Sequence, residues 1–401
     1  MKTTNSFLAI ARKNFVILIL YFSFFLASGG MEGSIPFVFD ARSISEHNYG
    51  VFLSALSILE IVFPLAVVYL ACKYNPVTIN NIFIIIVIIA SYLINLFASN
   101  TIMFIGLLLI GVSRTVFNCS VGNAISQTIP ADERVKYFAV RDLFLYGAIA
   151  ISMFISQRVL EMHRVETIYA VLSLCLIVTI VSAAKTGGII AKNPDCKTEQ
   201  KNLKISSYYS ELKTIIKNKL FVVILVMQIA SAIYSVVLRF IPLLALQNNI
   251  SAGVFLQYVG VFTLINCIGS LALSHWVSIA NKKLIYLLDV VFDIISASIF
   301  IFAATPYIFL LGLSFSLLKD MFAPVAFSYF YDCTDYIDMK DSAPAMLGLM
   351  STISSGINVI VPVVIGLYWG TNSNNVIFIS MLCLLTSFII GAKFLPAMRR
   401  Q

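Results

Sequence analysis

Eight ionisable side chains lie inside long apolar stretches of the sequence. The acids are Glu32, Glu60, Asp289, Asp293 and Asp320, and the bases are Arg114, Arg239 and Lys319. A charged side chain at the centre of a hydrocarbon layer costs at least ~2.5 kcal/mol, so each indicates a function or a charged partner. The acids outnumber the bases, and a desolvated carboxyl group can take up a proton near neutral pH. This set of residues therefore favours proton exchange.

The patterns that would indicate enzyme chemistry are absent from the sequence. The seven cysteines show no C-x-x-C spacing, and of the three histidines two lie outside the long apolar runs and His275 lies at the end of one. The sequence contains neither H-E-x-x-H nor G-x-x-x-x-G-K, and no Ser/His or paired-Asp motif supplies a nucleophile with its base. We therefore expect no catalytic residue, no metal and no cofactor.

The elements that must position these charges are expected to be membrane helices. Hydrophobic residues make up 60% of the 401 residues and charged residues 11%, against about 25% charged in soluble chains. At about 20 residues per span, the apolar runs predict an all-α membrane protein with twelve transmembrane helices. The runs are 14–39, 50–72, 79–99, 101–126, 137–157, 167–185, 220–246, 252–277, 284–303, 306–330, 343–368 and 374–395.

The distribution of basic residues predicts the orientation of the chain. Among the segments between spans, Lys and Arg concentrate on one side, and the other side carries only Arg42, Arg158 and Arg164. Because positive charge marks the cytoplasmic side, the protein is expected in the cell membrane with both termini and the linker 186–219 on the cytoplasmic side. The net charge of +8 therefore reflects topology, and no nucleic-acid partner is expected. Residues 15–30 resemble a secretory signal, but the apolar run continues to Phe39 and is interpreted as the first span.

Short matches at a nearly constant offset indicate an internal repeat. Gly-Val-Phe-Leu occurs at 50–53 and again at 253–256, and Gly111-Val112-Ser113 corresponds to residues 312–314. This alignment places Asn118 opposite Lys319. The domains are therefore predicted as a six-helix bundle over 1–185, a linker over 186–219 and a second, pseudo-symmetric bundle over 220–401.

On these features the chain resembles the major facilitator superfamily of transporters. Residues 269–274, followed by Asn281-Lys282-Lys283, resemble the family's G-x-x-x-D-R-x-G-R-R signature, and residues 72–76 retain little of its usual first copy. Arg114 is similar to the span-four arginine of drug/proton antiporters, and Glu32 with Asp40 resembles the acidic pair found in some of them. However, span five, with Gly147 to Ala150, lacks the G-x-x-x-G-P-x-x-G-G pattern of exporters.

The resemblance and the depths of the charges suggest roles for individual residues. At 1.5 Å per residue, Glu32 and Arg239 lie roughly 26 and 28 Å from the inner surface, so they are expected to pair as an outer gate. Each residue instead pairing within its own half is the alternative. Proton coupling is assigned to Glu32, Asp40, Arg114 and Asp320, and substrate binding to Asn118, Arg239, Lys319 and Glu60.

The remaining charges have structural interpretations. Lys319 and Asp320 are expected to form a self-compensating ion pair. The alternative is that Lys319 attracts an anionic group of the substrate. Asp289 and Asp293, spaced i, i+4 on one face of span nine, favour structural pairing over substrate contact. Arg141-Asp142 is assigned to a cytoplasmic charge network, and the acidic loop 332–341 is expected to pair with the basic linker.

The predicted function is secondary active transport of a small organic solute by a monomer working through alternating access. The first hypothesis is proton-coupled export of a hydrophobic or cationic compound. The alternative within transport is uptake of a small metabolite such as a sugar, a peptide or an organic anion. A membrane sensor or immunity protein that has lost turnover is the competing class. The expected partners are the solute, protons and the lipid bilayer.

Overall fold

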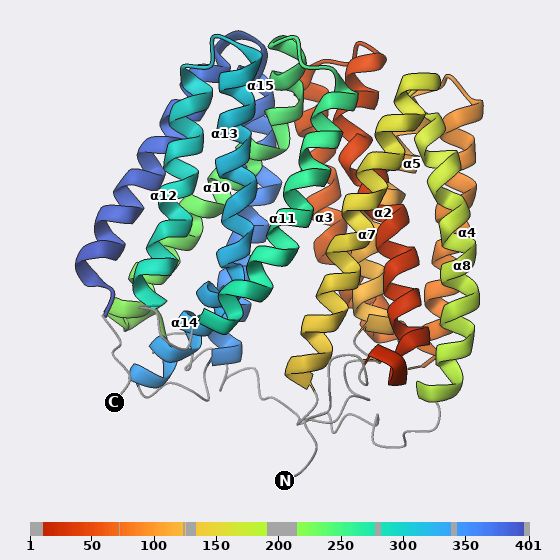
Figure 1. Ribbon diagram of the computed structural model, residues 1–401, viewed down its shortest axis with the longest axis horizontal. Coiled ribbons are helices and arrows are strands. Elements are labelled where there is room, and N and C mark those ends of the chain that lie inside the picture. Colours follow the sequence, from red (N-terminus) through yellow and green to blue (C-terminus); the bar gives the residue numbers. More distant parts are fainter. Residues whose placement is uncertain are drawn as a thin grey trace. The chain divides into compact units, whose positions relative to one another are not determined.

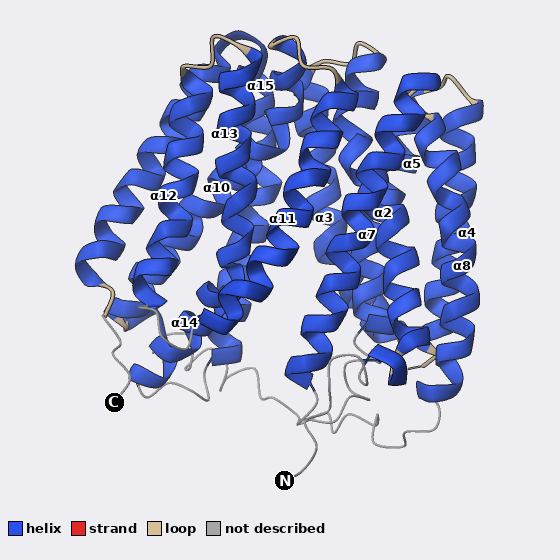
Figure 2. Ribbon diagram, in the orientation of Figure 1, coloured by secondary structure: helices blue, strands red, loops and turns tan. Residues whose placement is uncertain are grey.

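A computed structural model describes residues 11–71, 73–122, 125, 134–190, 215–276, 282–337 and 343–396. Its regular elements in these ranges are all helices, as Figure 2 shows. The expected all-α membrane fold is therefore confirmed, and the long apolar runs do form helices. The acidic positions Asp338 and Asp341 and most of the linker 186–219 lie outside the described residues.

The helices of the first half follow the expected spans closely (Figure 1). Their bounds are α2 Phe15–Ala41, α3 Glu46–Ala71, α4 Pro76–Leu96, α5 Asn100–Phe117, the π-helix η1 Asn118–Gly122, α7 Arg134–Met162 and α8 Thr167–Ile190. The start of α4 is fixed by local chemistry, because Asn75 accepts a hydrogen bond from the Val77 amide and Pro76 occupies the first turn.

The second half begins with α10 Lys219–Gln247, α11 Ala252–Trp276 and α12 Lys282–Ile301. Next come α13 Pro306–Leu318, the 3₁₀ segment η3 Lys319–Phe322, α14 Ala323–Tyr336 and α15 Ala343–Phe394. The last two expected spans are joined as α15, with a break at Asn372, whose φ of −147° and ψ of 42° are not helical. The expected span 306–330 is divided by η3.

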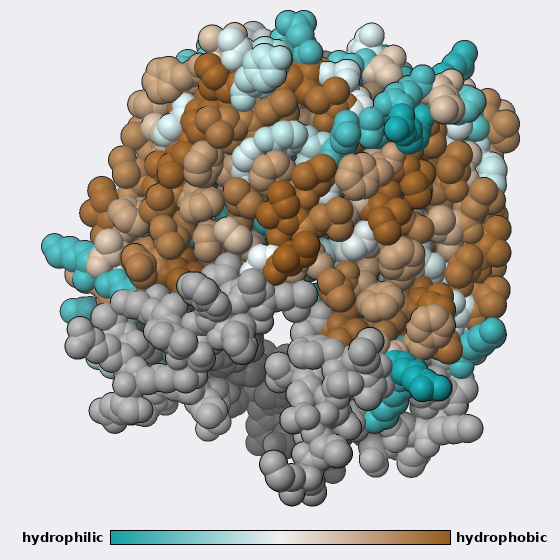
Figure 3. Space-filling model, in the orientation of Figure 1, coloured by the Kyte–Doolittle hydropathy of each residue, from teal (hydrophilic) through white to brown (hydrophobic). Residues whose placement is uncertain are grey.

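Nine helices in the described ranges are long and apolar enough to cross a membrane, and one of them, Gly348–Phe394, covers two of the expected spans. Many large apolar side chains on these helices are exposed, for example Ile85 and Ile89 on α4 and Ile177 and Val181 on α8. Figure 3 shows such apolar residues over most of the described surface in view. A surface of this kind suits contact with lipid tails.

The chain forms two compact units, and each includes a segment from the other half of the sequence. Unit 1 contains residues 1–44, 55–199 and 251–267, and unit 2 contains 45–54, 200–250 and 268–401. The beginning of α3 therefore packs with the second half, and most of α11 packs with the first. The domain boundaries expected from the sequence, 1–185, 186–219 and 220–401, stay a prediction.

Each unit has its own helix packing. In unit 1, α2 packs against α7 and α8, and α4 packs against α5 and α8. In unit 2, α10 packs against α15, and α12 packs against α13 and α15. Aromatic rings fill part of each interior, such as Phe24 stacked on Phe117 at 4.0 Å and Phe240 against Trp369 at 5.1 Å between ring centroids. This packing fixes the positions of the helices that carry the intramembrane charges, such as α2 and α5 in unit 1 and α12 in unit 2.

Candidate functional site

The first charged cluster lies in unit 1 between α2 and α5. Glu32 Oε2 is 3.8 Å from Arg114 Nη1, and the two side chains are 28% and 45% exposed. The guanidinium group of Arg114 also lies over the ring of Phe25, 5.1 Å from its centroid. Arg114 of α5 is therefore held by two residues of α2, Glu32 and Phe25, while the ion pair stays partly exposed. A carboxylate in such a position can exchange a proton and change the charge next to Arg114.

Aromatic side chains of α2 and α5 form one wall of this cluster. Phe117 stacks on Phe24 and meets Tyr21 edge-on at 5.3 Å. Directly after Phe117 the helix changes to the π-helix η1, which begins at the exposed Asn118. Single-turn π segments inside α-helices are frequent at functional sites. Asn118 therefore stays a candidate for substrate contact next to Arg114, one turn away.

The second charged cluster lies in unit 2. Lys319 Nζ, at the start of η3, is 3.0 Å from Asp293 Oδ2 of α12, and the side chains are 14% and 1% exposed. Lys319 also lies over the ring of Tyr234, 5.9 Å from its centroid, and the Tyr234 hydroxyl donates a hydrogen bond of 3.2 Å to Ser296 Oγ. The expected compensation of Lys319 by Asp320 is thus replaced by a buried bond to Asp293. The structural pairing expected for Asp293 is present.

Two further acids act on this second cluster. Asp289, one turn before Asp293 on α12, and Asp320, next to Lys319 on η3, both interact electrostatically with the ammonium group. Asp289 is half-buried, whereas Asp320 is exposed. Among the described residues, Lys319 is the cation that interacts with each of these three acids, and a bound proton would reduce the excess negative charge.

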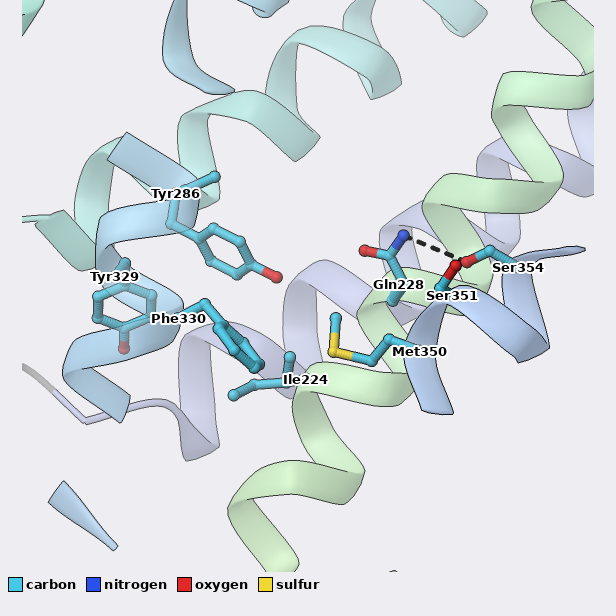
Figure 4. A pocket seen from close by; sticks show the side chains of 9 residues that line it. Ile224, Gln228, Tyr286, Tyr329, Phe330, Met350, Ser351 and Ser354 are labelled. Carbon is cyan, nitrogen blue, oxygen red and sulfur yellow. Dashed lines mark hydrogen bonds between the residues drawn. The ribbon is translucent and has the colours of Figure 1, made fainter. Parts of the chain in front are cut away.

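A cavity of 520 Å³ opens in unit 2 among α10, α12, α14 and α15. Its described lining is aromatic, apolar or uncharged and polar. The lining comprises Ile224, Gln228, Tyr286, Ala326, Tyr329, Phe330, Met350, Ser351 and Ser354. In Figure 4 the rings of Tyr286 and Phe330 lie on one side, and Gln228 donates a hydrogen bond to Ser354 on the other. Such a wall suits an uncharged or hydrophobic solute that carries a few hydrogen-bonding groups.

The remaining sequence-predicted residues are dispersed. Asp40 is exposed near the end of α2, Glu60 is half-buried in α3, and Arg239 is half-buried in α10. The carbonyl oxygen of Arg239 accepts a hydrogen bond of 3.0 Å from the Tyr49 hydroxyl. Glu32 contacts Arg114 within unit 1, as the alternative to the outer gate requires, and the Glu32–Arg239 gate stays a prediction.

Sequence reasoning missed the importance of Asp293 and of the cavity residues. The spacing Asp289–Asp293 was visible, but nothing in the sequence showed that Lys319 reaches α12. Gln228 is a polar residue in a long apolar run of α10, and it was the available signal for the cavity. The Arg141–Asp142 pair is present at 2.6 Å, with Arg141 over the ring of Tyr21.

A helical membrane fold with ion pairs between its helices and a solute-sized cavity is typical of membrane transport proteins. A family model described as Major Facilitator Superfamily matches residues 17–362. The chain belongs to this superfamily, whose members are generally transporters rather than enzymes. No curated protein sequence matches the chain significantly.

Solved transporter structures share the fold over nearly the whole chain. The D323A mutant of the nucleoside transporter NupG is 16% identical with a TM-score of 0.75, and the match covers 96% of this chain and all of that one. A bacterial homologue of the human lysosomal transporter Spinster, in an inward-facing and unoccupied conformation, is 11% identical with a TM-score of 0.68, covering 98% of each chain. A POT family transporter in complex with 5-aminolevulinic acid is 10% identical with a TM-score of 0.69, covering 95% of each chain.

Proposed function

We propose that this protein is a proton-coupled secondary active transporter that exports a hydrophobic or cationic organic compound. The observation that carries the proposal is the Glu32–Arg114 pair, because it lies between two apolar helices, α2 and α5, and both side chains are partly exposed. A proton that enters from water can neutralise Glu32 and leave Arg114 without its counter-charge. Binding of a proton and binding of a cationic solute next to Glu32 then exclude each other, which is the requirement for exchange.

The cavity of unit 2 supports the hydrophobic part of this proposal. Tyr286, Phe330 and Met350 offer rings and a thioether to a flat or flexible apolar group. Gln228, Ser351 and Ser354 offer donors and acceptors without adding charge. A solute in this cavity would be held by packing and a few hydrogen bonds.

Uptake of a small uncharged metabolite is the second candidate function. Gln228, Ser351 and Ser354 can form hydrogen bonds with a polar solute, whereas a pure hydrocarbon offers them no hydrogen-bonding group. The fold similarity to a nucleoside transporter and to a POT family transporter agrees with such a role. The non-transporting sensor is disfavoured by the cost of keeping paired charges within apolar helices.

Flux measurements in proteoliposomes under opposed pH gradients separate these candidates. The full chain is reconstituted, and radiolabelled tetraphenylphosphonium, uridine, a dipeptide and a sugar are tested as solutes. Exchange predicts accumulation of tetraphenylphosphonium when the lumen is acidic, because outward proton flow then drives solute inward. Uptake coupled to proton entry predicts accumulation of a metabolite when the external medium is acidic.

A protonophore and a parallel membrane-potential clamp serve as controls for passive distribution of the cation. Accumulation must exceed that of protein-free liposomes and must disappear with the protonophore. Accumulation of a metabolite only under external acid would replace export by uptake. Movement of no solute under either gradient would contradict transport and favour the sensor.

A further inference from the structure

The buried pair of unit 2 has a feature that the pair of unit 1 lacks. Asp293 is 1% exposed, and only its Oδ2 atom is bonded to Lys319. Its Oδ1 atom is buried without a hydrogen-bond partner among the described residues. A buried carboxylate normally has both oxygens satisfied, because each unpaired charged atom carries the full desolvation cost. A proton on Oδ1 would remove the negative charge and so lower that cost.

The charged groups that face Asp293 come from three elements. Lys319 and Asp320 belong to η3, Asp289 belongs to α12 itself, and Tyr234 belongs to α10. From the other packed helices, Asp332 of α14 is bonded to Lys282 at 2.6 Å, and Lys393 of α15 lies over Phe394. On α13, Tyr307 is 83% exposed. Lys319 is therefore the cation that balances Asp293.

The backbone around Lys319 is the second independent observation. The α-helix ends at Leu318, and η3 continues as a 3₁₀ segment that packs on α12. In the first half, α5 ends at Phe117 and η1 begins at Asn118, which is the repeat counterpart of Lys319. Corresponding helices of the two halves, α5 and α13, are thus interrupted at the same position of the repeat. Such breaks often mark hinges, and this one carries the cation of a buried pair.

We propose that Asp293 is a proton-binding group of the transport cycle and that its protonation releases Lys319 from α12. This inference rests on the proposed proton-coupled transport and adds a coupling site in unit 2. One H⁺ forms an O–H bond at Oδ1, so Asp293 changes from −1 to neutral while Lys319 keeps its three protons and its +1 charge. Lys319 then loses its charged partner, and Asp289 of α12 and the exposed Asp320 of η3 remain as the acids that interact with it.

A bond between sequence neighbours has a precedent in this molecule. Arg141 and Asp142 form an ion pair of 2.6 Å within α7. Transfer of Lys319 from Asp293 to Asp320 would move the cation from a buried acid to an exposed one. Protonation of buried Asp293 would therefore change the net charge around the exposed Asp320 of η3.

Infrared difference spectroscopy of the purified full-length protein in nanodiscs tests proton binding without any solute. Lowering the pH should produce a protonated-carboxyl band that is missing in Asp293→Asn and retained in Asp332→Asn. Asp332 is the matched control, because it also bonds a lysine, Lys282 at the first residue of α12, but is 35% exposed. A band that persists unchanged in Asp293→Asn would overturn the proposal. Asp293→Asn with Lys319→Met provides a variant without an uncompensated buried cation, in case the single change prevents folding.

A transport measurement separates this inference from the proposed function. For the solute that the wild type accumulates, whether tetraphenylphosphonium or uridine, Asp293→Asn should lower gradient-driven accumulation at least about tenfold, equivalent to about 1.4 kcal/mol of lost coupling. Solute counterflow without a pH gradient should persist. Wild-type accumulation in Asp293→Asn would reject the inference while leaving proton-coupled transport intact. Absence of transport in the wild type would reject the proposed function, and the infrared band would still decide whether Asp293 binds a proton.

Discussion

Glu32 occupies a position in which either charge state can be tolerated. It is bonded to Arg114 at 3.8 Å, a separation longer than that of a strong charge-assisted hydrogen bond. The Arg114 cation has a second favourable contact with the ring of Phe25. Loss of the carboxylate charge is therefore partly offset for Arg114, which suits a group that must gain and release a proton in each cycle.

Replacement of Glu32 by Gln is expected to keep the fold and remove proton coupling. The amide has the same shape but does not exchange a proton, so gradient-driven accumulation should fall at least about tenfold, or about 1.4 kcal/mol. Flux under an imposed pH gradient is the measurement. Glu161→Gln, an exposed change in the last turns of α7, should behave as the wild type. Undiminished coupling in Glu32→Gln would contradict the role given to this residue.

Arg42 is expected to stabilise the fold of unit 1 and to have no direct role in transport. Its guanidinium group donates to Glu166 at 3.0 Å and to the carbonyl oxygens of Ala98 and Phe97 at 3.0 and 3.3 Å, which ties the end of α2 to the turn after α4. Hydrogen bonds to charged groups contribute about 1.5–3 kcal/mol, so Arg42→Ala should lower the unfolding free energy by about that amount.

The thermal unfolding of Arg42→Ala in detergent measures this loss. The control is Arg158→Ala, because Arg158 is 73% exposed and bonded to the exposed Glu161 at 2.8 Å. Exposed pairs contribute little, so this variant should unfold close to the wild-type temperature. Equal destabilisation by the two changes would show that the bonds of Arg42 do not hold the turn.

At the scale of elements, the crossing of α3 and α15 depends on two glycines. A Cβ atom on Gly50 would overlap the carbonyl oxygen of Pro362, and one on Gly366 would lie 2.7 Å from the carbonyl oxygen of Glu46. Because both obstacles are backbone atoms, they cannot turn aside as a side chain would. Close approach of two helices at small residues is a common way to join membrane helices.

Gly50→Ala and Gly366→Ala are therefore expected to force the two helices apart. Overpacking of this kind costs about 1–3 kcal/mol, which should appear as a lower thermal unfolding temperature in detergent. Gly356→Ala is the matched control in α15, since no neighbouring atom lies within 4 Å of its Cβ position. A control that unfolds as early as Gly366→Ala would argue against a steric cause.

The helices could be predicted from the sequence because the lipid environment requires long apolar runs. The expected start of the run at 252 coincides with the start of α11, and the run at 167 coincides with the start of α8. The breaks at Asn118 and Lys319 were not predicted, although Pro324 lies at the start of α14 directly after η3 and was an available signal for the second break. The Lys319–Asp293 bond was also hidden, because sequence does not fix how α12 and α13 rotate about their axes.

Part of the candidate site could be predicted, because the lipid environment also makes charged residues in apolar runs conspicuous. Intramembrane charge is visible in a sequence, so Glu32, Arg114 and Lys319 could be named as candidates, and their roles stay predictions. Their partners depend on packing, and the predicted gate of Glu32 with Arg239 joins residues of different units. The cavity lining was not found, because Tyr286, Phe330 and Met350 are ordinary residues in apolar helices and acquire a role only through their arrangement.

At the scale of the whole molecule, the distribution of Lys and Arg predicts which loops face the cytoplasm. The turn containing Lys73 and Tyr74 should lie inside, and the turn between α12 and α13 at Ala304 should lie outside. Both positions are exposed, so a cysteine at either should react with a maleimide that reaches it.

Tyr74→Cys and Ala304→Cys, each in a variant without the seven native cysteines, test this orientation in intact cells. A membrane-impermeant maleimide should label Ala304→Cys directly and Tyr74→Cys only after permeabilisation. The reversed pattern would place both termini outside the cell. It would also change the side of the membrane to which each face of the reconstituted protein corresponds in the cell, because export and uptake are defined by the direction in which the solute crosses the cell membrane. The two labelling results therefore determine how the reconstituted flux applies to the cell.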